Sequence, residues 1–170
     1  MRHCNTCGNP ENEHPYAHPF IPEIFGRHSE KSSDWDSRFL RLAEHVGMWS
    51  KDPSTRVGCV IVDPKRRVLS VGYNGFPRGV EDDPTILADR PAKYARVVHA
   101  ELNAILNKGD VEGATLYCSL FPCNECAKSI IQSGIIRVVA PKPDTPRWNS
   151  AHAIALEMLE LADVKVSYVE

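Results

Sequence analysis

The chain has 170 residues, and its 20 Lys and Arg against 22 Asp and Glu give a net charge of −2 at pH 7. This balance excludes a strongly basic nucleic-acid binder, and no run of the sequence reaches the roughly 18 to 20 apolar residues of a membrane span. Hydrophobic residues at 42% and charged residues at 25% are ordinary for a globular domain, so we expect a cytoplasmic protein whose core needs no disulfides.

The first 33 residues are rich in His, Pro and Asn, and we expect them to form an extension to a domain at 34–170. Four Cys and His residues of the extension, Cys4, Cys7, His14 and His18, could form a Cys2His2 set, and four is the number of ligands that a closed structural zinc site needs. Bound metal would supply the stability that so short and polar a segment lacks. The alternative is a His-rich leader with loose cysteines, because the spacing matches no standard zinc finger.

Beyond the extension, apolar residues recur at helical spacing. Trp35, Phe39, Leu42, Val46 and Trp49 form one stripe, which predicts an amphipathic helix. The helix would begin with Ser33 as its N-cap and Asp36 as the acid of its first turn.

Two β-strands and a loop are expected next. The apolar runs at 57–62 and 68–71 flank a turn-forming Asp-Pro-Lys-Arg sequence, so they predict a hairpin whose first strand is buried on both faces. The segment 72–79 is rich in helix and strand breakers, as a binding loop often is, and the charged stretch up to Arg96 has no clear period.

The second half of the chain alternates helices and strands. We expect helices at 99–108, 122–134 and 150–161, and strands at 114–118, 135–140 and 164–169. Cys59 and Cys118 lie in apolar strands and are predicted to be small buried hydrophobes. The predicted order is α, β, β, α, β, α, β, α, β.

Three zinc-type ligands lie at the starts of two of these helices. His99 is in the first turn of one helix, and Cys123 and Cys126 share a face of the other because they are three residues apart. A helix N-terminus favours the thiolate form of cysteine. Three protein ligands leave a fourth position open, which is typical of a catalytic zinc site. Glu101, two residues after His99, is placed to carry protons to and from the zinc-bound water.

The combination of HAE at 99–101 with PCNEC at 122–126 matches the signature of zinc deaminases. With these motifs, the GYNGFPRG segment at 72–79 and the HAELNAI segment at 99–105, the chain resembles the zinc-dependent cytidine and deoxycytidylate deaminase family, and its dCMP deaminases most of all. The resemblance implies an α/β fold, a three-layer α/β/α sandwich around a five-stranded mixed sheet. It also marks 34–170 as the zinc-dependent deaminase domain.

The resemblance implies hydrolytic deamination of dCMP to dUMP and ammonia, which would supply dUMP for thymidylate synthesis. Zinc on His99, Cys123 and Cys126 would provide hydroxide, and Glu101 would shuttle protons. Asn74 would hold the sugar and base, the backbone N–H of Ala100 would meet the pyrimidine O2, and the carbonyl of Phe121 would accept from the amino group.

Several alternatives remain open. Asn74 beside Gly75 could instead be a turn residue in the left-handed region. The substrate could be dCTP or a 5-substituted dCMP. A single-stranded nucleic-acid deaminase is disfavoured, because the chain has neither excess positive charge nor many aromatic residues.

The resemblance further implies a homo-oligomer and regulation by dCTP and dTTP with Mg²⁺. The expected effector site is the glycine-rich loop, through Gly72, Tyr73, Gly75, Arg78 and Gly79. Glycines there would allow close approach of a ligand, and Arg78 would neutralise phosphate. The alternative is that this loop only shapes the catalytic pocket around Asn74.

Overall fold

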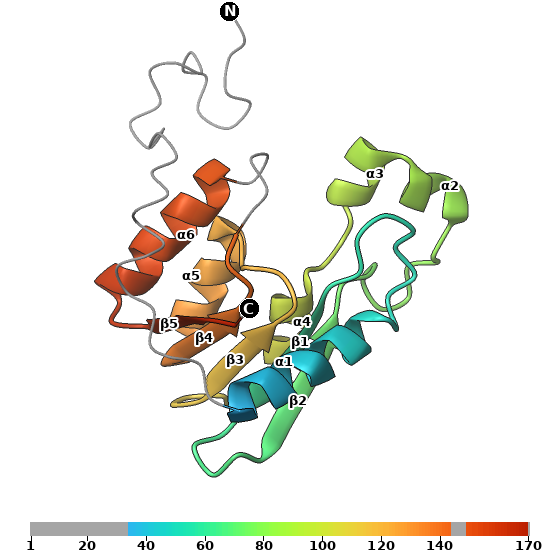
Figure 1. The fold of residues 1–170 in the computed structure, drawn as a ribbon. Helices are drawn as coiled ribbons and strands as arrows, with labels where there is room; N and C mark the ends of the chain where they lie inside the picture. Colours follow the sequence, from blue (N-terminus) through green and yellow to red (C-terminus); the bar gives the residue numbers. More distant parts are fainter. Residues whose placement is uncertain (1–33, 144–148, 170) are drawn as a thin grey trace, which may run out of the picture.

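A computed structural model describes residues 34–143 and 149–169 of the chain. The predicted cap Ser33 and the four predicted donors of a second zinc, Cys4, Cys7, His14 and His18, lie outside the described residues. Six helices and five strands occur within the described part (Figure 1). In chain order they are α1 (Asp34–Gly47), β1 (Gly58–Val62), β2 (Val68–Tyr73), α2 (Pro84–Ala88), α3 (Arg90–Tyr94), α4 (Ala100–Lys108), β3 (Thr115–Cys118), α5 (Asn124–Gln132), β4 (Arg137–Ala140), α6 (Asn149–Leu161) and β5 (Lys165–Tyr168).

The five strands form one mixed sheet in the order β2-β1-β3-β4-β5. β1 pairs antiparallel with both β2 and β3, whereas β3, β4 and β5 run parallel. Every residue of β1 is buried, which confirms the prediction that this strand is covered on both faces. The expected five-stranded mixed sheet is therefore confirmed.

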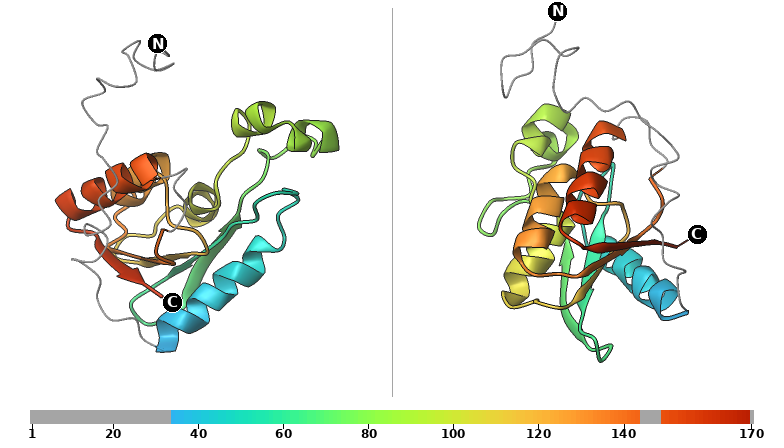
Figure 2. Two further views of the ribbon diagram at one scale, coloured as in Figure 1. Left: turned by 45° about the horizontal axis from the view of Figure 1, so that its top comes forward. Right: turned by 90° about the vertical axis from the view of Figure 1, so that its left-hand side faces the viewer.

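Alternate side chains of the central strands point into two separate cores. On one face, α1 packs Phe39 and Ala43 against a cluster that includes Val60 and Tyr117. On the other face, α4, α5 and α6 cover a larger cluster that includes Ile61 and Leu116. Figure 2 shows these helices on opposite sides of the sheet, so the predicted three-layer sandwich is confirmed.

The apolar stripe predicted for the first helix is only partly buried. Phe39 and Val46 lie in the core, but Trp35, Leu42 and Trp49 are exposed. The buried face of α1 is centred on Ala43 instead and includes the polar residue Asp36, so the stripe forms one edge of that face.

Asp36 is buried because it accepts hydrogen bonds from side chains of the sheet. Both terminal nitrogens of Arg137 bond to its carboxylate, at 2.8 and 3.0 Å, and Tyr117 donates to it at 2.9 Å. Burial and this hydrogen bond raise the pKa of Tyr117. The acid predicted for the first turn thus also joins α1 to β3 and β4.

Two short helices, α2 and α3, were missed in the charged stretch before Arg96. Their signals are local: Asp83 accepts from the backbone N–H of Thr85, Asp89 accepts from that of Ala92, and a proline stands one or two residues after each acid. Five residues are too few to display a helical period, so the pattern of apolar residues could not find them. The predicted order of elements therefore lacked two helices between β2 and α4. This pair, α2 and α3, stands away from the sheet (Figures 1 and 2).

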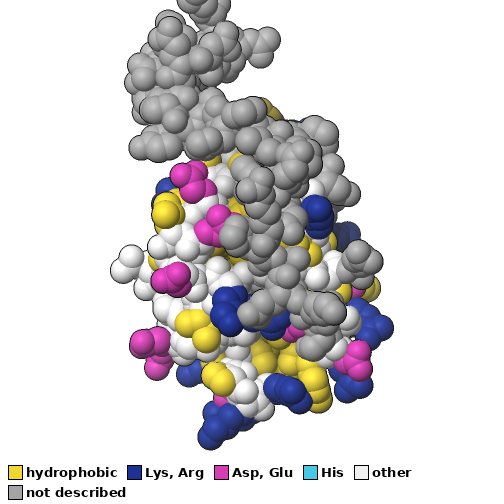
Figure 3. All heavy atoms as spheres, turned by 60° about the vertical axis from the view of Figure 1, so that its left-hand side comes forward, with side chains coloured by type: hydrophobic (Ala, Val, Ile, Leu, Met, Phe, Trp, Pro, Cys, Tyr) yellow, Lys and Arg dark blue, Asp and Glu magenta, His cyan; other side chains and the backbone are white. Residues whose placement is uncertain are grey.

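The remaining boundaries are close to those expected. One correction concerns Pro122, which was expected to open a helix. α5 begins at Asn124, because Cys123 has an extended backbone and serves as the N-cap. None of the described helices is both long and apolar enough to cross a bilayer. On the face drawn in Figure 3, Lys and Arg side chains are scattered among Asp and Glu, as the near-neutral total charge leads one to expect.

Candidate active site

The site is built at the adjoining N-termini of α4 and α5. His99 is the N-cap of α4, Cys123 is the N-cap of α5, and Cys126 lies in the first turn of α5. Gly72 in β2 lets α4 approach the sheet, because a side chain there would overlap backbone atoms of Ala100 and Ala104. The position of His99 relative to the sheet therefore depends on a residue without a side chain.

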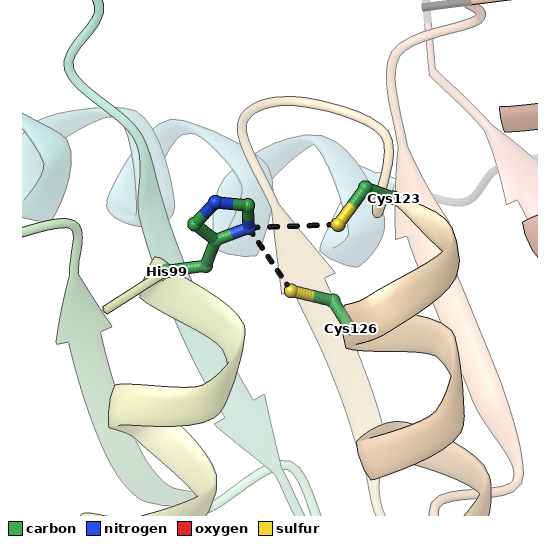
Figure 4. A group of neighbouring side chains, drawn as sticks. All are labelled: His99, Cys123 and Cys126. Atoms are coloured by element: carbon green, nitrogen blue, oxygen red, sulfur yellow. Dashed lines mark hydrogen bonds between the residues drawn. The ribbon is translucent and has the colours of Figure 1, made fainter. Parts of the chain in front are cut away.

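The structure brings the three predicted zinc ligands together (Figure 4). The Nδ1 atom of His99 lies 3.3 Å from the Sγ of Cys126 and 3.5 Å from the Sγ of Cys123. With Zn–N and Zn–S bonds of standard length, the edge of a tetrahedron between such ligands is about 3.6 Å. One imidazole and two thiols at these spacings fit zinc both in donor type and in geometry.

The electrostatics of the cluster favour a cation. Hydrogen bonding from Cys126 lowers the pKa of the Cys123 thiol to about 4, and His99 acts in the same direction. The contact with Cys123 and burial raise the pKa of Cys126, while the pKa of His99 is raised by its contact with Cys123. The group thus loses one thiol proton readily and retains the second until a positive ion replaces it.

Glu101 lies one helical position beyond Ala100 and lines the same pocket as His99 and Cys123. Its side chain is buried, and burial raises its pKa. A carboxyl group whose pKa is raised by burial holds a proton more readily than an exposed one, and a group that can accept and return a proton suits the role of general acid and base.

The pocket that contains these groups is lined from several elements. The three residues predicted to bind substrate, Asn74, Ala100 and Phe121, all line it. The other lining residues are Asp52, Thr55, Val57, Arg90, Lys93, Tyr94, Val97, His99, Glu101, Leu120, Cys123 and His152.

The side-chain amide of Asn74 is fixed by the neighbouring loop. Its Oδ1 accepts from the backbone N–H of Val57 at 2.8 Å, and its Nδ2 donates to the carbonyl of Thr55 at 2.9 Å. Among described non-glycine residues, positive φ occurs only at Arg66 and Asp163, so the interpretation of Asn74 as a left-handed turn residue is wrong.

Sequence reasoning missed an ion pair in the wall of the pocket. The Nζ of Lys93 lies 2.9 Å from Oδ1 of Asp52 and donates to Ser54 at 2.6 Å, and both charged side chains are buried. Asp52 also accepts from the backbone N–H groups of Ser54 and Thr55. The two residues lie in separate segments, 52–55 and 93–94, and no local pattern indicated that these segments meet.

His152 was also missed, because a single histidine on an apolar helix gives no functional signal. Its ring packs edge-on against that of Phe121, with the centroids 5.5 Å apart, and burial lowers its pKa. A hydrogen bond with the backbone of Phe121 acts in the opposite direction on that pKa. His152 therefore supports the wall of the pocket that faces Cys123.

The five residues of the predicted effector loop are not among those that line this pocket. Gly72 is packed under α4, Gly75 pairs with Val98 in an isolated bridge, and Arg78 donates to Asn107 at 2.8 Å. Tyr73 ends β2, and Gly79 has a φ of +83°. Any effector binding there would occur outside the catalytic pocket.

Comparisons with known proteins agree with this geometry. Residues 33–142 match the family model for the cytidine and deoxycytidylate deaminase zinc-binding region. The chain is 43% identical over 141 residues to an uncharacterized deaminase of the luxG 3′ region from Aliivibrio fischeri, covering 81% of this chain and 95% of the relative. It is 45% identical over 126 residues to the deoxycytidylate deaminase of Homo sapiens, covering 70% and 71%.

Solved structures extend the agreement to the fold. The dCMP deaminase from the cyanophage S-TIM5, in complex with dCMP and dUMP, superposes with a TM-score of 0.67 and 23% identity, covering 81% of this chain and 98% of the other. At that identity the match supports the fold alone. The sequence matches independently confirm the resemblance that the motifs indicated.

Proposed function

The chain belongs to the cytidine and deoxycytidylate deaminase family, and we propose that it hydrolyses dCMP to dUMP and ammonia. The observation that carries the proposal is the cluster of His99, Cys123 and Cys126 with the buried Glu101 in one pocket. The relatives named deoxycytidylate deaminases, at 45% identity and above, favour dCMP over other cytosine compounds. The product would feed thymidylate synthesis.

His99, Cys123 and Cys126 would hold the zinc, and three protein ligands would leave it a position for water. Zinc bound there supplies a water molecule whose pKa is lowered toward neutral pH. Cys126 and Glu101 are buried and His99 and Cys123 are half-buried, so solvent screens their charges less than it would at the surface.

Glu101 is the proton carrier. Its carboxylate takes up a proton from water and delivers it to N3 of the cytosine ring as the water oxygen forms a bond to C4. It then moves the remaining proton of the added oxygen to the amino nitrogen, the C4–N bond breaks, ammonia leaves, and that oxygen becomes the 4-carbonyl of dUMP. One water is consumed for each dCMP, and no oxidant or reductant is needed.

The remaining substrate contacts come from the pocket wall. Asn74 holds the sugar and base, the backbone N–H of Ala100 donates to the pyrimidine O2, and the carbonyl of Phe121 accepts from the amino group. The amide of Asn74 is held by Val57 and Thr55, which supports its role as a pre-oriented group.

We extend the proposal to features that lie further from the pocket. These are a cytoplasmic homo-oligomer, a second structural zinc on Cys4, Cys7, His14 and His18, and a nucleotide effector with Mg²⁺ on the glycine-rich loop. Zinc analysis of the full chain and of a chain lacking residues 1–33 tests the second metal. Equal zinc content in the two would remove it.

The decisive experiment offers dCMP, dCTP, deoxycytidine and CMP side by side to the zinc-loaded protein and follows ammonia release. The expected result is a kcat/KM for dCMP above those of the other three, and ammonia release lowered at least about 10²-fold in the Glu101→Gln variant. Preference for dCTP would reassign the substrate, and a smaller loss of ammonia release in Glu101→Gln would overturn the proposed chemistry.

A further inference from the structure

Two cationic side chains of Lys or Arg line the pocket among the described residues, and both come from α3. Lys93 is buried and committed to Asp52 and Ser54. Arg90, one turn earlier, is exposed at the pocket. Their different surroundings mean that only Arg90 has charge available for a ligand.

The guanidinium of Arg90 is held in place by its own helix. Its Nε donates to the hydroxyl of Tyr94 at 3.1 Å, and its central carbon lies 5.9 Å from the centroid of the Tyr94 ring. No described residue accepts a hydrogen bond from the two terminal nitrogens, and no described carboxylate forms an ion pair with Arg90. The side chain is thus oriented but retains a pair of donors.

The charges around the pocket make this donor pair significant. Lys93 neutralises Asp52, and Glu101 adds a further acidic group, so without Arg90 the lining has no uncompensated cation of Lys or Arg type. A nucleoside monophosphate such as dCMP carries a phosphate with up to two negative charges. Two parallel N–H donors of a guanidinium match two phosphate oxygens.

We propose that Arg90 binds the 5′-phosphate of the substrate and thereby selects nucleotides over nucleosides, with Tyr94 fixing the orientation of the guanidinium. This inference rests on the proposed function. In this arrangement the cytosine lies beside the zinc ligands at the N-termini of α4 and α5. The phosphate lies beside α3, which with α2 forms the helix pair that stands away from the sheet (Figure 1).

The test compares kcat/KM for dCMP and for deoxycytidine in the zinc-loaded protein and its variants. For Arg90→Leu, the ratio of the two values should fall about 10- to 100-fold, the range for lost charge-assisted hydrogen bonds. Arg90→Lys should keep part of the ratio, because it retains the charge but not the paired donors. Tyr94→Phe should lower the ratio by a smaller factor, because Arg90 stays but is less well oriented.

Arg96→Leu is the matched control. Arg96 is an exposed arginine two residues beyond α3, it donates to the carbonyl of Ala92, and it does not line the pocket. Its replacement should leave the dCMP to deoxycytidine ratio unchanged. An equal loss of activity on both substrates in Arg90→Leu, or a ratio no lower than that of Arg96→Leu, would overturn the proposal.

Binding of dCMP to Glu101→Gln, with and without Arg90→Leu, gives a second measurement that needs no turnover. We expect the double variant to bind dCMP about 10- to 100-fold more weakly. If the unmodified protein releases ammonia from neither substrate, the proposed function fails, and this comparison still decides on Arg90. Equal affinities would exclude Arg90 as the phosphate ligand.

Discussion

Replacing Lys93 with Met removes the cation from a buried ion pair and leaves the Asp52 carboxylate with neutral donors only. The two side chains are 4% and 6% exposed, so solvent cannot compensate for the loss. Breaking a buried pair from one side costs about 3–5 kcal/mol of stability. The lower end, about 3 kcal/mol, applies here because Ser54 and Thr55 continue to donate to Asp52.

The assay is thermal or urea unfolding followed by tryptophan fluorescence. A loss of about 3 kcal/mol in a chain of this size lowers the melting temperature by about 6–12 °C. Lys51→Met is the matched control, because Lys51 lies 2.8 Å from Asp82 in a pair that is 70% and 32% exposed. An exposed pair of similar length should shift the melting temperature by no more than about 4 °C.

The pH dependence gives an independent check. Burial alone would raise the pKa of Asp52, but the hydrogen bonds from Lys93, Ser54 and Thr55 outweigh it and hold the pKa below its usual value. A lowered folded pKa stabilises the protein above the unfolded value, about 3.9, and that contribution disappears as the pH falls through the folded pKa. The difference in the free energy of unfolding between wild type and Lys93→Met should therefore be largest at pH 7 and become smaller below about pH 4.

Equal melting shifts for Lys93→Met and Lys51→Met would refute this reasoning, as would a gap that widens on acidification. A double variant, Asp52→Asn with Lys93→Met, tests the coupling. It keeps an acceptor for Ser54 and Thr55 while removing both charges, so its loss should be smaller than the sum of the two single losses.

The other predictions concern the site and its supports. Glu101→Gln should lower kcat by at least about 10² while metal analysis finds unchanged zinc; retained turnover would contradict its role as proton carrier. Cys126→Ser should lose zinc, and a zinc content equal to wild type would exclude it as a ligand. Gly72→Ala should cost about 2–3 kcal/mol in urea unfolding, because the new methyl group meets the backbone of α4. Arg137→Leu should cost about 3 kcal/mol by removing the guanidinium that pairs with the buried Asp36, and a neutral result would show that this ion pair adds no net stability.

Elements with a strong local pattern could be predicted from the sequence. The run at 57–62 is apolar on both faces because β1 lies between α1 and the helices of the other layer. The buried face of α1 could not be predicted in the same way. Asp36 can be buried in that face because Arg137 and Tyr117 of the sheet donate hydrogen bonds to its carboxylate. The spacing of apolar residues within the helix does not reveal such long-range pairing.

The metal cluster could be predicted because each ligand is fixed by a helix start next to it. The pocket wall was different, since Lys93 meets Asp52 across 41 positions in the sequence, and His152 reaches Phe121 from the last helix. Those contacts depend on how whole elements are placed, which a single sequence does not encode in any short motif.

The strand order also sets a constraint on how this protein is made. The hairpin of β1 and β2 is local and can form as soon as it leaves the ribosome, but the other edge of β1 pairs with β3, which is synthesised more than 50 residues later. Until then the nascent chain presents a fully apolar strand with one row of unpaired backbone groups. Exposed edges of this kind associate readily with other chains. We therefore expect translation of the stretch between β2 and β3 to be the period in which a chaperone protects the product most, and slow synthesis there to lower the soluble yield.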